Sequence, residues 1–253
     1  MSKRVKKIVA IIVVIAIIAV SYYVWSKIRG YETGVASLAN VLASTSQRRI
    51  ENTLTIVSDS SPYLALIATP VALYYDRTDL KVSPLLVLNS ENNSRAVIRF
   101  LNLYKQLSVV TIGNVPTTLS SNERAWEAPT TFTLNITQSF DGSLKDISLN
   151  VGRHFWSRSD GVILIESTQE GYNQAVALLP IACYVNIPVI VTDVVDEKVA
   201  NVLKGLGVKY SLVCGNIRGY GLTKRLVNVE ETQDWTIAIL RQRLLSNVSY
   251  ITM

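Results

Sequence analysis

The sequence predicts an α/β protein: an N-terminal transmembrane helix, then a doubly wound, mostly parallel sheet built from two βαβαβ repeats with a small antiparallel insertion. Three observations support this prediction. An uncharged apolar run lies near the N-terminus, and two later stretches share one order of strands and helices. The strands in both stretches are short and almost continuously apolar, which is typical of parallel strands buried on both faces.

The repeat is clearest in residues 83–114, SPLLVLNSENNSRAVIRFLNLYKQLSVVTIGN, and residues 187–216, IPVIVTDVVDEKVANVLKGLGVKYSLVCGN. Each stretch enters an apolar strand through proline and follows that strand with a polar residue. Each then continues through a segment of helical period into a second apolar strand and ends in Gly-Asn. A further strand and helix precede both stretches, so each copy is predicted to hold three strands and two helices.

Residues 1–29 are predicted to be a cytoplasmic tail and a transmembrane signal anchor. Four cations precede the uncharged run from Ile8 to Trp25, which as a helix would span about 27 Å of a bilayer core of ~30 Å. Tyr22 and Tyr23 lie at its far end, where an aromatic belt belongs. The distribution of cations predicts a single-pass protein of the cell membrane, with its N-terminus in the cytoplasm and its body outside. A pilin-type leader that is cut before the apolar run is the alternative.

Residues 30–53 have apolar positions at helical spacing and are predicted to form a helical stalk, or else a plain spacer. Residues 54–116 are predicted to form the first repeat. Its first helix starts at Pro62, a favourable first position, and is almost entirely apolar, which indicates that it is buried. Pro70 inside this helix predicts a kink or an early end.

Residues 117–160 interrupt the repeat. The alternating segment TFTLNITQSF, followed by Asp-Gly, predicts an antiparallel insertion or edge, and the segment after it predicts a helix that packs on the sheet. Residues 161–221 are predicted to form the second repeat, with Pro180 in the place of Pro70. Residues 222–253 hold an amphipathic helix and a strand-like end, NVSYITM. That end either closes the sheet or marks a shortened form of a longer repeat protein.

The net charge of +6 resides in the N-terminal segment. Six Lys and Arg residues and no acidic residue precede Gly30, which leaves 19 basic against 19 acidic residues in the rest of the chain. A neutral body lacks the basic footprint of a nucleic-acid-binding domain. The sequence therefore predicts no nucleic-acid partner.

Motifs for catalysis or metal binding are missing from the sequence. It has no Gly-x-Gly-x-x-Gly after a strand, no P-loop and no paired His or Cys ligands for zinc. The single histidine, His154, lies in a predicted amphipathic helix, which favours a structural role. Cys183 and Cys214 could form a disulfide, but two small buried apolar residues are the favoured interpretation. We therefore expect no cofactor, no metal and no enzyme activity.

Candidate binding residues follow from the predicted sheet, because ligands of such folds bind at the carboxyl ends of the strands. Polar residues and Gly-Asn turns follow the strands of both repeats, namely Asp59, Asn89, Gly113 and Asn114 in the first and Glu166, Asp193, Gly215 and Asn216 in the second. Capping and turn formation are the favoured alternative. Asp and Asn accept backbone N–H bonds at helix starts, and Gly-Asn suits turns with positive φ.

The second repeat, ALLPIACYVNIPVIVTDVVDEKVANVLKGLGVKYSLVCGN, resembles the type 2 cell-wall-binding repeat. The matching features are a helix containing proline, a strand entered through proline, Leu-Gly near the end of the next helix and a strand that ends in a glycine turn: Pro180, Ile187-Pro188, Leu206-Gly207 and Gly215. The first repeat is similar through Pro70, Pro84 and Gly113. The resemblance implies a surface protein whose repeats form a compact module that holds anionic cell-wall polymer non-covalently. Behind a membrane anchor, such repeats would fit an archaeal surface protein.

These features together predict a membrane-anchored, extracytoplasmic protein of the cell envelope with a structural or binding role. Its expected partners are the membrane and either a cell-envelope polymer or another surface protein, and an oligomer is compatible with the pattern. A solute-binding or sensor ectodomain, with its cleft at the strand carboxyl ends, is the alternative. Three sequons are consistent with an outside location and make Asn92, Asn135 and Asn247 glycosylation candidates.

Overall fold

The computed structural model of the 253-residue chain describes residues 17–23, 46–49, 54–76, 79–89, 95–103, 108–121, 130–219 and 223–244. The chain divides into two compact units, residues 1–40 and 41–253. The described residues of the first unit, Ile17 to Tyr23, are helical and exposed. Every other element described below belongs to the second unit.

The predicted membrane anchor requires a correction. None of the helices in the described part of the chain combines the length and the apolar character that crossing a membrane requires. Of the predicted span from Ile8 to Trp25, the described helical part is Ile17 to Tyr23, and the rest lies outside the described residues. The predicted single-pass location, with the body outside, is therefore overturned.

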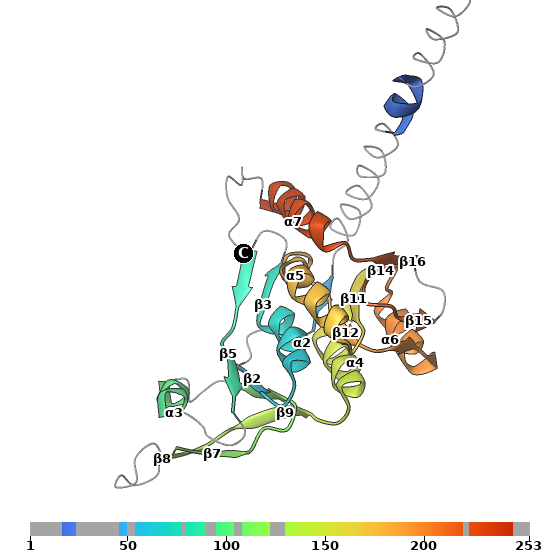
Figure 1. Ribbon diagram of the computed structural model, residues 1–253. Helices are drawn as coiled ribbons and strands as arrows, with labels where there is room; N and C mark the ends of the chain where they lie inside the picture. The colour runs from blue at the N-terminus through green and yellow to red at the C-terminus, as the bar shows by residue number, and fades with distance from the viewer. Residues whose placement is uncertain are drawn as a thin grey trace, which may run out of the picture. The chain divides into compact units, whose positions relative to one another are not determined.

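The first repeat forms a four-stranded parallel sheet with the order β5-β2-β6-β9 (Figure 1). Its elements are β2 (Leu54–Ser58), α2 (Pro62–Ala72), β5 (Leu85–Leu88), α3 (Arg95–Leu103), β6 (Val109–Ile112) and β9 (Ile136–Phe140). Between α2 and β5 the chain forms an antiparallel pair of strands, β3 (Leu73–Asp76) and β4 (Asp79–Val82). Between β6 and β9 it forms a second such pair, β7 (Thr118–Ser121) and β8 (Thr130–Thr133).

The second repeat forms its own four-stranded parallel sheet, with the order β12-β11-β14-β16. Its elements are β11 (Gly161–Ile165), α5 (Gln169–Val185), β12 (Val189–Val191), α6 (Glu197–Leu206), β14 (Tyr210–Cys214) and β16 (Thr223–Leu226). Helix α4 (Leu144–Phe155) precedes this repeat and helix α7 (Val229–Leu244) follows it. Two short pairs complete the fold: β1 (Gln47–Arg48) with β10 (Trp156–Arg158), and β13 (Val194–Val195) with β15 (Arg218–Gly219).

The prediction of a single doubly wound sheet is wrong, because the repeats build two separate sheets. Strand β9, from the segment between the repeats, takes the edge of the first sheet beside β6. Helix α4 then leads the chain to the second repeat, where it contacts β12 at the edge of the second sheet. The repeats therefore meet through helices and not through a continuous ladder of strands.

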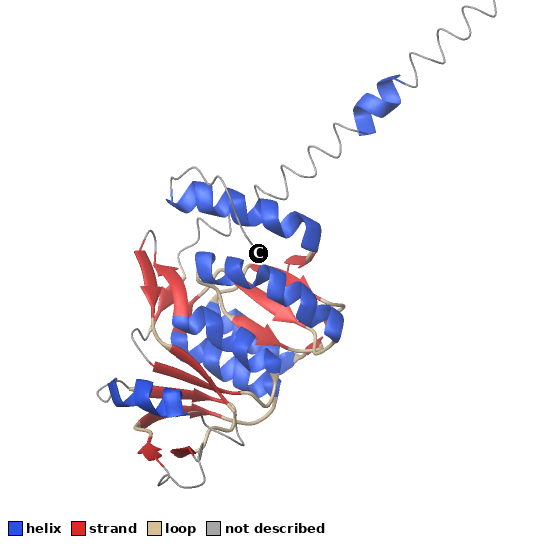
Figure 2. Cartoon of the chain, turned by 60° about the vertical axis from the view of Figure 1, so that its left-hand side comes forward, coloured by secondary structure: helices blue, strands red, loops and turns tan. Residues whose placement is uncertain are grey.

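Helices α2 and α4 lie between the two sheets, and α5 packs on α2 and on the second sheet (Figure 2). Helix α2 contacts β2 of the first sheet and β12 of the second, and α5 contacts both α2 and β11. Two pairs of aromatic rings connect α2 and the strand after it, β3, to α5. Tyr63 and Tyr172 lie at the starts of the two helices, with 5.5 Å between ring centroids. Tyr75 on β3 and Tyr184 near the end of α5 lie 5.3 Å apart. The two helices therefore run in the same direction, and the carboxyl ends of both sheets lie at the same end of the unit.

Local sequence fixes where these helices begin and end. The hydroxyl of Thr168 accepts a bond from the Gly171 amide at the start of α5, and the Asp196 carboxylate accepts one from the Val199 amide at the start of α6. Helix α5 ends at Asn186 (φ 55°) and α6 at Gly207 (φ 75°), both in the left-handed conformation that favours these residue types. Helix α2 begins at Pro62 and ends two residues after Pro70, in keeping with the early end that the sequence predicts.

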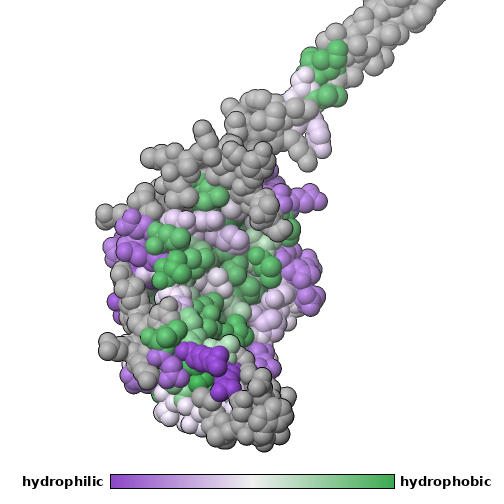
Figure 3. Space-filling model, turned by 90° about the vertical axis from the view of Figure 1, so that its left-hand side faces the viewer, coloured by the Kyte–Doolittle hydropathy of each residue, from purple (hydrophilic) through white to green (hydrophobic). Residues whose placement is uncertain are grey.

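One side of the first repeat presents apolar residues to solvent (Figure 3). In the described part of the chain β5 is an edge strand, and Val87 on it is 53% exposed. Leu80 and Val82 on β4 are 50% and 66% exposed. The face of the first sheet away from α2 is covered by α3 and the β7–β8 pair. These elements pack on each other around Leu54, Ile98 and Leu119.

Arg48 joins the segment before the repeats to both of them. Its guanidinium lies between the rings of Tyr74 and Trp156, 3.9 Å from each centroid. Its Nε donates to Asn186 Oδ1 at 2.7 Å, and its Nη2 donates to the Pro70 carbonyl. Trp156 is fully buried and donates to the Asn186 carbonyl at 2.8 Å. Arg48 therefore contacts the carboxyl ends of α2 and α5 at once.

We expect Arg48→Ala to lower the free energy of unfolding by about 2–4 kcal/mol, because it removes charge-assisted hydrogen bonds and two ring contacts. Urea denaturation followed by circular dichroism would measure the change. The adjacent Arg49→Ala is the matched control, since Arg49 is exposed and pairs with Phe155 through its backbone amide. Equal stability of the two variants would show that Arg48 does not join the repeats.

Candidate functional site

The strand registers give the equivalence between the two repeats. Val57 pairs with Ile112 in the first sheet, and Ile165 pairs with Cys214 in the second. The next residues along the chains correspond in turn, which aligns Ser58 with Glu166, Gly113 with Gly215, and Asn114 with Asn216. Asn89 likewise aligns with Asp193.

The strand ends of the second repeat are closed by the side chain of Glu166. Its Oε2 accepts from the Asn216 amide at 2.9 Å and from the Thr168 hydroxyl at 3.1 Å. The Gly215 amide donates to Gln174 Oε1 at 2.7 Å. Gly215 has a φ of 85°, and the Glu166 side chain lies so close to its Cα that no Cβ would fit. Three of the four predicted site residues in this repeat, Glu166, Gly215 and Asn216, therefore form hydrogen bonds within the chain.

Asp193 contributes a second link between strand ends. Its Oδ1 accepts from the Ser167 amide at 2.8 Å and from the Ser167 hydroxyl at 2.6 Å. These two bonds hold the pKa of the Asp193 carboxyl below its ordinary value, against a smaller opposing effect of burial. Asp193 thus ties the end of β12 to the end of β11.

Tyr63 connects the two repeats at this end of the unit. Its hydroxyl donates to the Thr168 carbonyl at 2.7 Å, and its ring meets Tyr172 edge to face. Burial, followed by the charge of Asp193, raises the pKa of the Tyr63 hydroxyl. The hydroxyl is therefore kept as a neutral donor.

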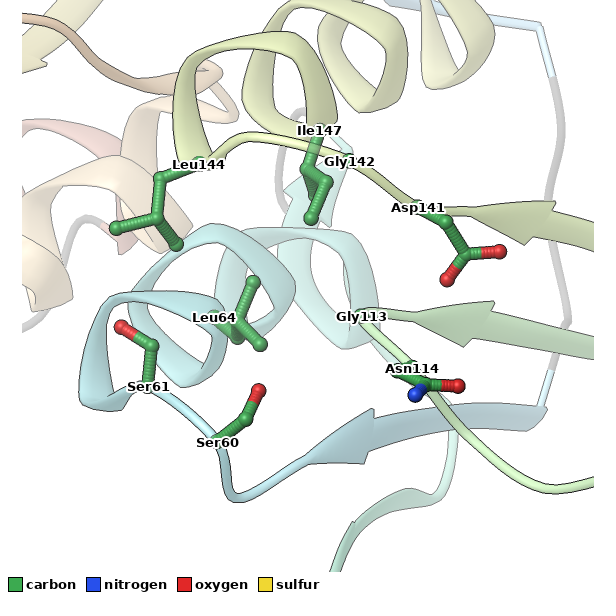
Figure 4. A pocket seen from close by; sticks show the side chains of 9 residues that line it. All are labelled: Ser60, Ser61, Leu64, Gly113, Asn114, Asp141, Gly142, Leu144 and Ile147. Carbon is green, nitrogen blue, oxygen red and sulfur yellow. The ribbon is translucent and has the colours of Figure 1, made fainter.

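A pocket of about 330 Å³ lies at the strand ends of the first repeat (Figure 4). In the second repeat the side chain of Glu166 closes the equivalent position. Leu64 from α2 and Leu144 and Ile147 from α4 form the apolar part of the pocket. Its polar and backbone parts come from the ends of β2, β6 and β9, namely Ser60, Ser61, Gly113, Asn114, Asp141 and Gly142. The pocket therefore lies across the carboxyl ends of three parallel strands.

The chain topology places this pocket at a switch point. After β2 the chain enters α2, in the layer between the sheets, and after β6 it enters the β7–β8 pair, which packs against α3 on the other face. Neighbouring parallel strands whose connections leave to opposite faces open a crevice at their carboxyl ends, and ligands of α/β proteins bind there. The pocket lies in the crevice between the ends of β2 and β6.

The predicted site residues of the first repeat divide into two groups. Gly113 and Asn114 line the pocket. Asp59 and Asn89 are exposed beside it and do not line it, although each takes part in other interactions. Asn135 is exposed before β9, while Asn92 and Asn247 lie outside the described residues. The registers bring the predicted residues to two strand-end clusters, one in each repeat.

Seven lining residues were not among the predicted site residues: Ser60, Ser61, Leu64, Asp141, Gly142, Leu144 and Ile147. Asp141-Gly142 has the composition of a hairpin turn, but the structure uses it to lead from β9 into α4. Strand β9 pairs parallel to β6, and this pairing carries Asp141 to the carboxyl edge of the sheet. One local signal in the sequence marks this change from strand to helix. Ser143 caps α4 by accepting from the Asp146 amide at 3.1 Å.

The cysteines and the histidine are part of the packing. Cys183 and Cys214 are free and buried, and burial raises the pKa of each thiol to about 12. The ring of His154 contacts Phe140 and Phe155, and burial lowers the pKa of the imidazole. Among the described residues no group of three His, Cys, Asp or Glu could hold a metal ion.

A second pocket, of about 450 Å³, lies between α4 and the start of α6 and is lined by Arg153, Asp196, Glu197, Lys198 and Asn201. Ion pairs already join the two helices here. Lys145 pairs with Asp196 at 2.8 Å, and Lys198 pairs with Asp146. Two of its lining residues, Asp196 and Lys198, are thus already paired with residues of α4.

Comparisons with known proteins give a limited result. No protein-family model and no curated protein matches the sequence. Among solved structures, the chain is similar to Cwp8 from Clostridium difficile (TM-score 0.48, 14% identity, covering 75% of this chain and 34% of that one). It is also similar to Cwp6 from Clostridium difficile (TM-score 0.49, 13% identity, covering 77% of this chain and 32% of that one). The chain spans about a third of the length of either structure.

The contacts of Asp193 predict a dependence of stability on pH. Because folding lowers the pKa of this carboxyl, the ionised form stabilises the fold at neutral pH, and that contribution is lost as the pH falls through the folded-state pKa. We expect Asp193→Asn to be less stable than the wild type near pH 7 and to lose less stability between about pH 5 and pH 3.

Thermal unfolding across this pH range would measure the difference. Ser167→Ala keeps the carboxylate but removes one of its donors, so its acid profile is expected to lie between the other two. If Asp193→Asn reproduces the acid profile of the wild type, Asp193 makes no such contribution.

Proposed function

We propose that this chain is a binding protein of the cell envelope and that its working site is the pocket at the strand ends of the first repeat. The observation that carries the proposal is the difference between the two repeats at equivalent positions. The second repeat closes its strand ends with Glu166 and Gln174, whereas the first has Ser58 and Leu64 near the corresponding glycine and a pocket beside them.

The composition of the pocket supports binding. Its volume of about 330 Å³ is at the lower end of the range for ligand pockets, ~300–1,000 Å³. Leu64, Leu144 and Ile147 form an apolar wall of the pocket, while Ser60, Asn114 and Asp141 place polar groups around it. A few polar groups around an apolar centre are typical of sites that bind a small molecule or one unit of a larger one.

The location at the cell envelope rests on the residue pattern of the repeats. The pattern around Pro180, Ile187-Pro188 and Leu206-Gly207 resembles repeats of surface proteins that hold cell-wall polymer. On this basis the partner is an envelope polymer or another surface component. We assign binding without catalysis to the site, and a supporting role to the second repeat.

A purely structural role is the second candidate, and the second repeat favours it. All its strand-end groups that we have described, Glu166, Asp193, Gly215 and Asn216, bond within the chain. If the first repeat served the same purpose, its pocket would be a packing defect with no ligand. The experiment below separates the two candidates.

Co-sedimentation of the purified full-length chain with cell-envelope fragments from its source would test the proposal. We expect the wild type to sediment with the fragments and Asn114→Trp, which fills the pocket, to lose at least tenfold in affinity. Asn216→Trp is the matched control, because Asn216 is the equivalent exposed residue of the closed repeat. A wild-type chain that stays in solution, or an Asn114→Trp variant that sediments like the control, would contradict the proposal.

A further inference from the structure

Strand β5 has one side without a partner strand. The Thr55 amide on β2 donates to the Pro84 carbonyl at 3.0 Å, so the backbone groups of Pro84 face β2. Backbone groups alternate in direction along a strand, and those of Leu85 and Val87 therefore face away from β2. In the described part of the chain no strand pairs with this outer side. The N–H and C=O groups of Leu85 and Val87 are thus available to another strand.

This edge lacks the features that protect sheet edges from pairing, which are charged side chains, bulges and proline. Strand β5 has the sequence LLVL, and its register with β2 runs without a bulge. Val87 is 53% exposed. Pro84 precedes the strand, but its backbone faces β2, so it removes no donor from the outer side. The edge is therefore apolar, regular and open.

The apolar surface continues onto β4 (Figure 3). Leu80 and Val82 are half exposed or more, and β4 leads directly into the amino end of β5. A stable interface buries about 800 Å² per partner, which is more than the edge of a four-residue strand provides. The apolar side chains beside the edge supply further area, and exposed apolar surface of this kind marks an interaction site.

A second copy of the chain fits this edge because the pairing is self-complementary. When two β5 strands meet antiparallel about a twofold axis at Leu86, Leu85 of each copy lies opposite Val87 of the other. These residues then exchange N–H···O=C bonds in both directions, and Leu86 faces its own copy at a non-hydrogen-bonded position. The outward groups of both strands are satisfied, and two four-stranded sheets become one continuous sheet.

The charges around Leu86 suit pairing of the strand with itself. Residues 82–90 are uncharged, and this run is bounded by Lys81 on one side and Glu91 on the other. Glu91 lies outside the described residues, and its order in the sequence alone is used here. A twofold axis at Leu86 brings each end of the run toward the opposite end of its copy, so that unlike charges approach and no like charges face each other.

We propose that the chain forms a twofold dimer in which the β5 edges of two copies pair antiparallel about Leu86. The exposed side chains of Leu80, Val82 and Val87 lie along this interface. The dimer goes beyond the proposed binding function and does not depend on it. Neither β4 nor β5 contributes to the lining of the strand-end pocket, so each copy keeps its own pocket.

Sedimentation equilibrium of the purified full-length chain over a range of concentrations tests the dimer. We expect the wild type to dimerise and Val87→Lys to weaken association at least tenfold, because it places a charge on the paired edge. Val194→Lys is the matched control, since Val194 is similarly exposed on β13 of the second repeat. A wild-type chain that stays monomeric would overturn the proposal and leave the edge to an extended segment of another protein. A Val87→Lys variant that dimerises like the control would also overturn it.

A cysteine substitution tests the register. At a non-hydrogen-bonded position the two Cα atoms lie about 4.5 Å apart, within the range of about 4.4–6.8 Å for disulfides. We expect Leu86→Cys to form a covalent dimer under mild oxidation and Val194→Cys to remain uncrosslinked. Both native cysteines are buried and so do not contribute. If Val87→Lys fails to fold, as judged by circular dichroism, Leu86→Cys decides alone, and the absence of its covalent dimer would contradict pairing about Leu86.

Discussion

The guanidinium of Arg48 lies where the carboxyl ends of α2 and α5 come together, and the arrangement of the two repeats depends on this contact. The carboxyl end of a helix carries partial negative charge, which a nearby cation stabilises. Neither α2 nor α5 has a basic residue in its last turn. Arg48, on strand β1 before both repeats, donates hydrogen bonds at both helix ends. It donates to the Pro70 carbonyl of α2 and to the Asn186 side chain after α5. It thereby holds α2 and α5 side by side, in one direction, with both sets of strand ends at the same end of the unit.

This arrangement leaves two equivalent strand-end regions that differ in a few side chains. Where the second repeat has Glu166, with Gln174 on the following helix, the first has Ser58, with Leu64 against its glycine. The longer polar pair satisfies the backbone amides of Gly215 and Asn216 and fills the crevice. The shorter residues leave a pocket that α4, the helix after β9, covers with Leu144 and Ile147. The two similar strand-end regions thus differ, because side chains close one and the other has a pocket.

Periodicity and punctuation predicted the strands and helices of each repeat, because these depend on residues close in sequence. Pro62, Pro70 and the Gly-Asn turns are local signals of this kind. The pairing between repeats depends on contacts that no local pattern carries, so one continuous sheet was expected where two are found. The pocket was predicted in part. Gly113 and Asn114 follow a recognisable strand, but Asp141 reaches the site through the parallel pairing of β9 with β6, which its alternating sequence does not encode. Arg48 was missed because its partners are more than twenty residues away in sequence.

Native-state hydrogen exchange tests most directly whether the two repeats are one unit. Backbone amides in β2 and β6 report on the first sheet, and those in β11 and β14 on the second. If Arg48 and the α2–α5 contact couple the repeats, the slowest amides of both sheets will exchange with one common free energy of opening, that of global unfolding. Exchange of one sheet at a clearly lower free energy than the other would show that the repeats open independently and would contradict the account.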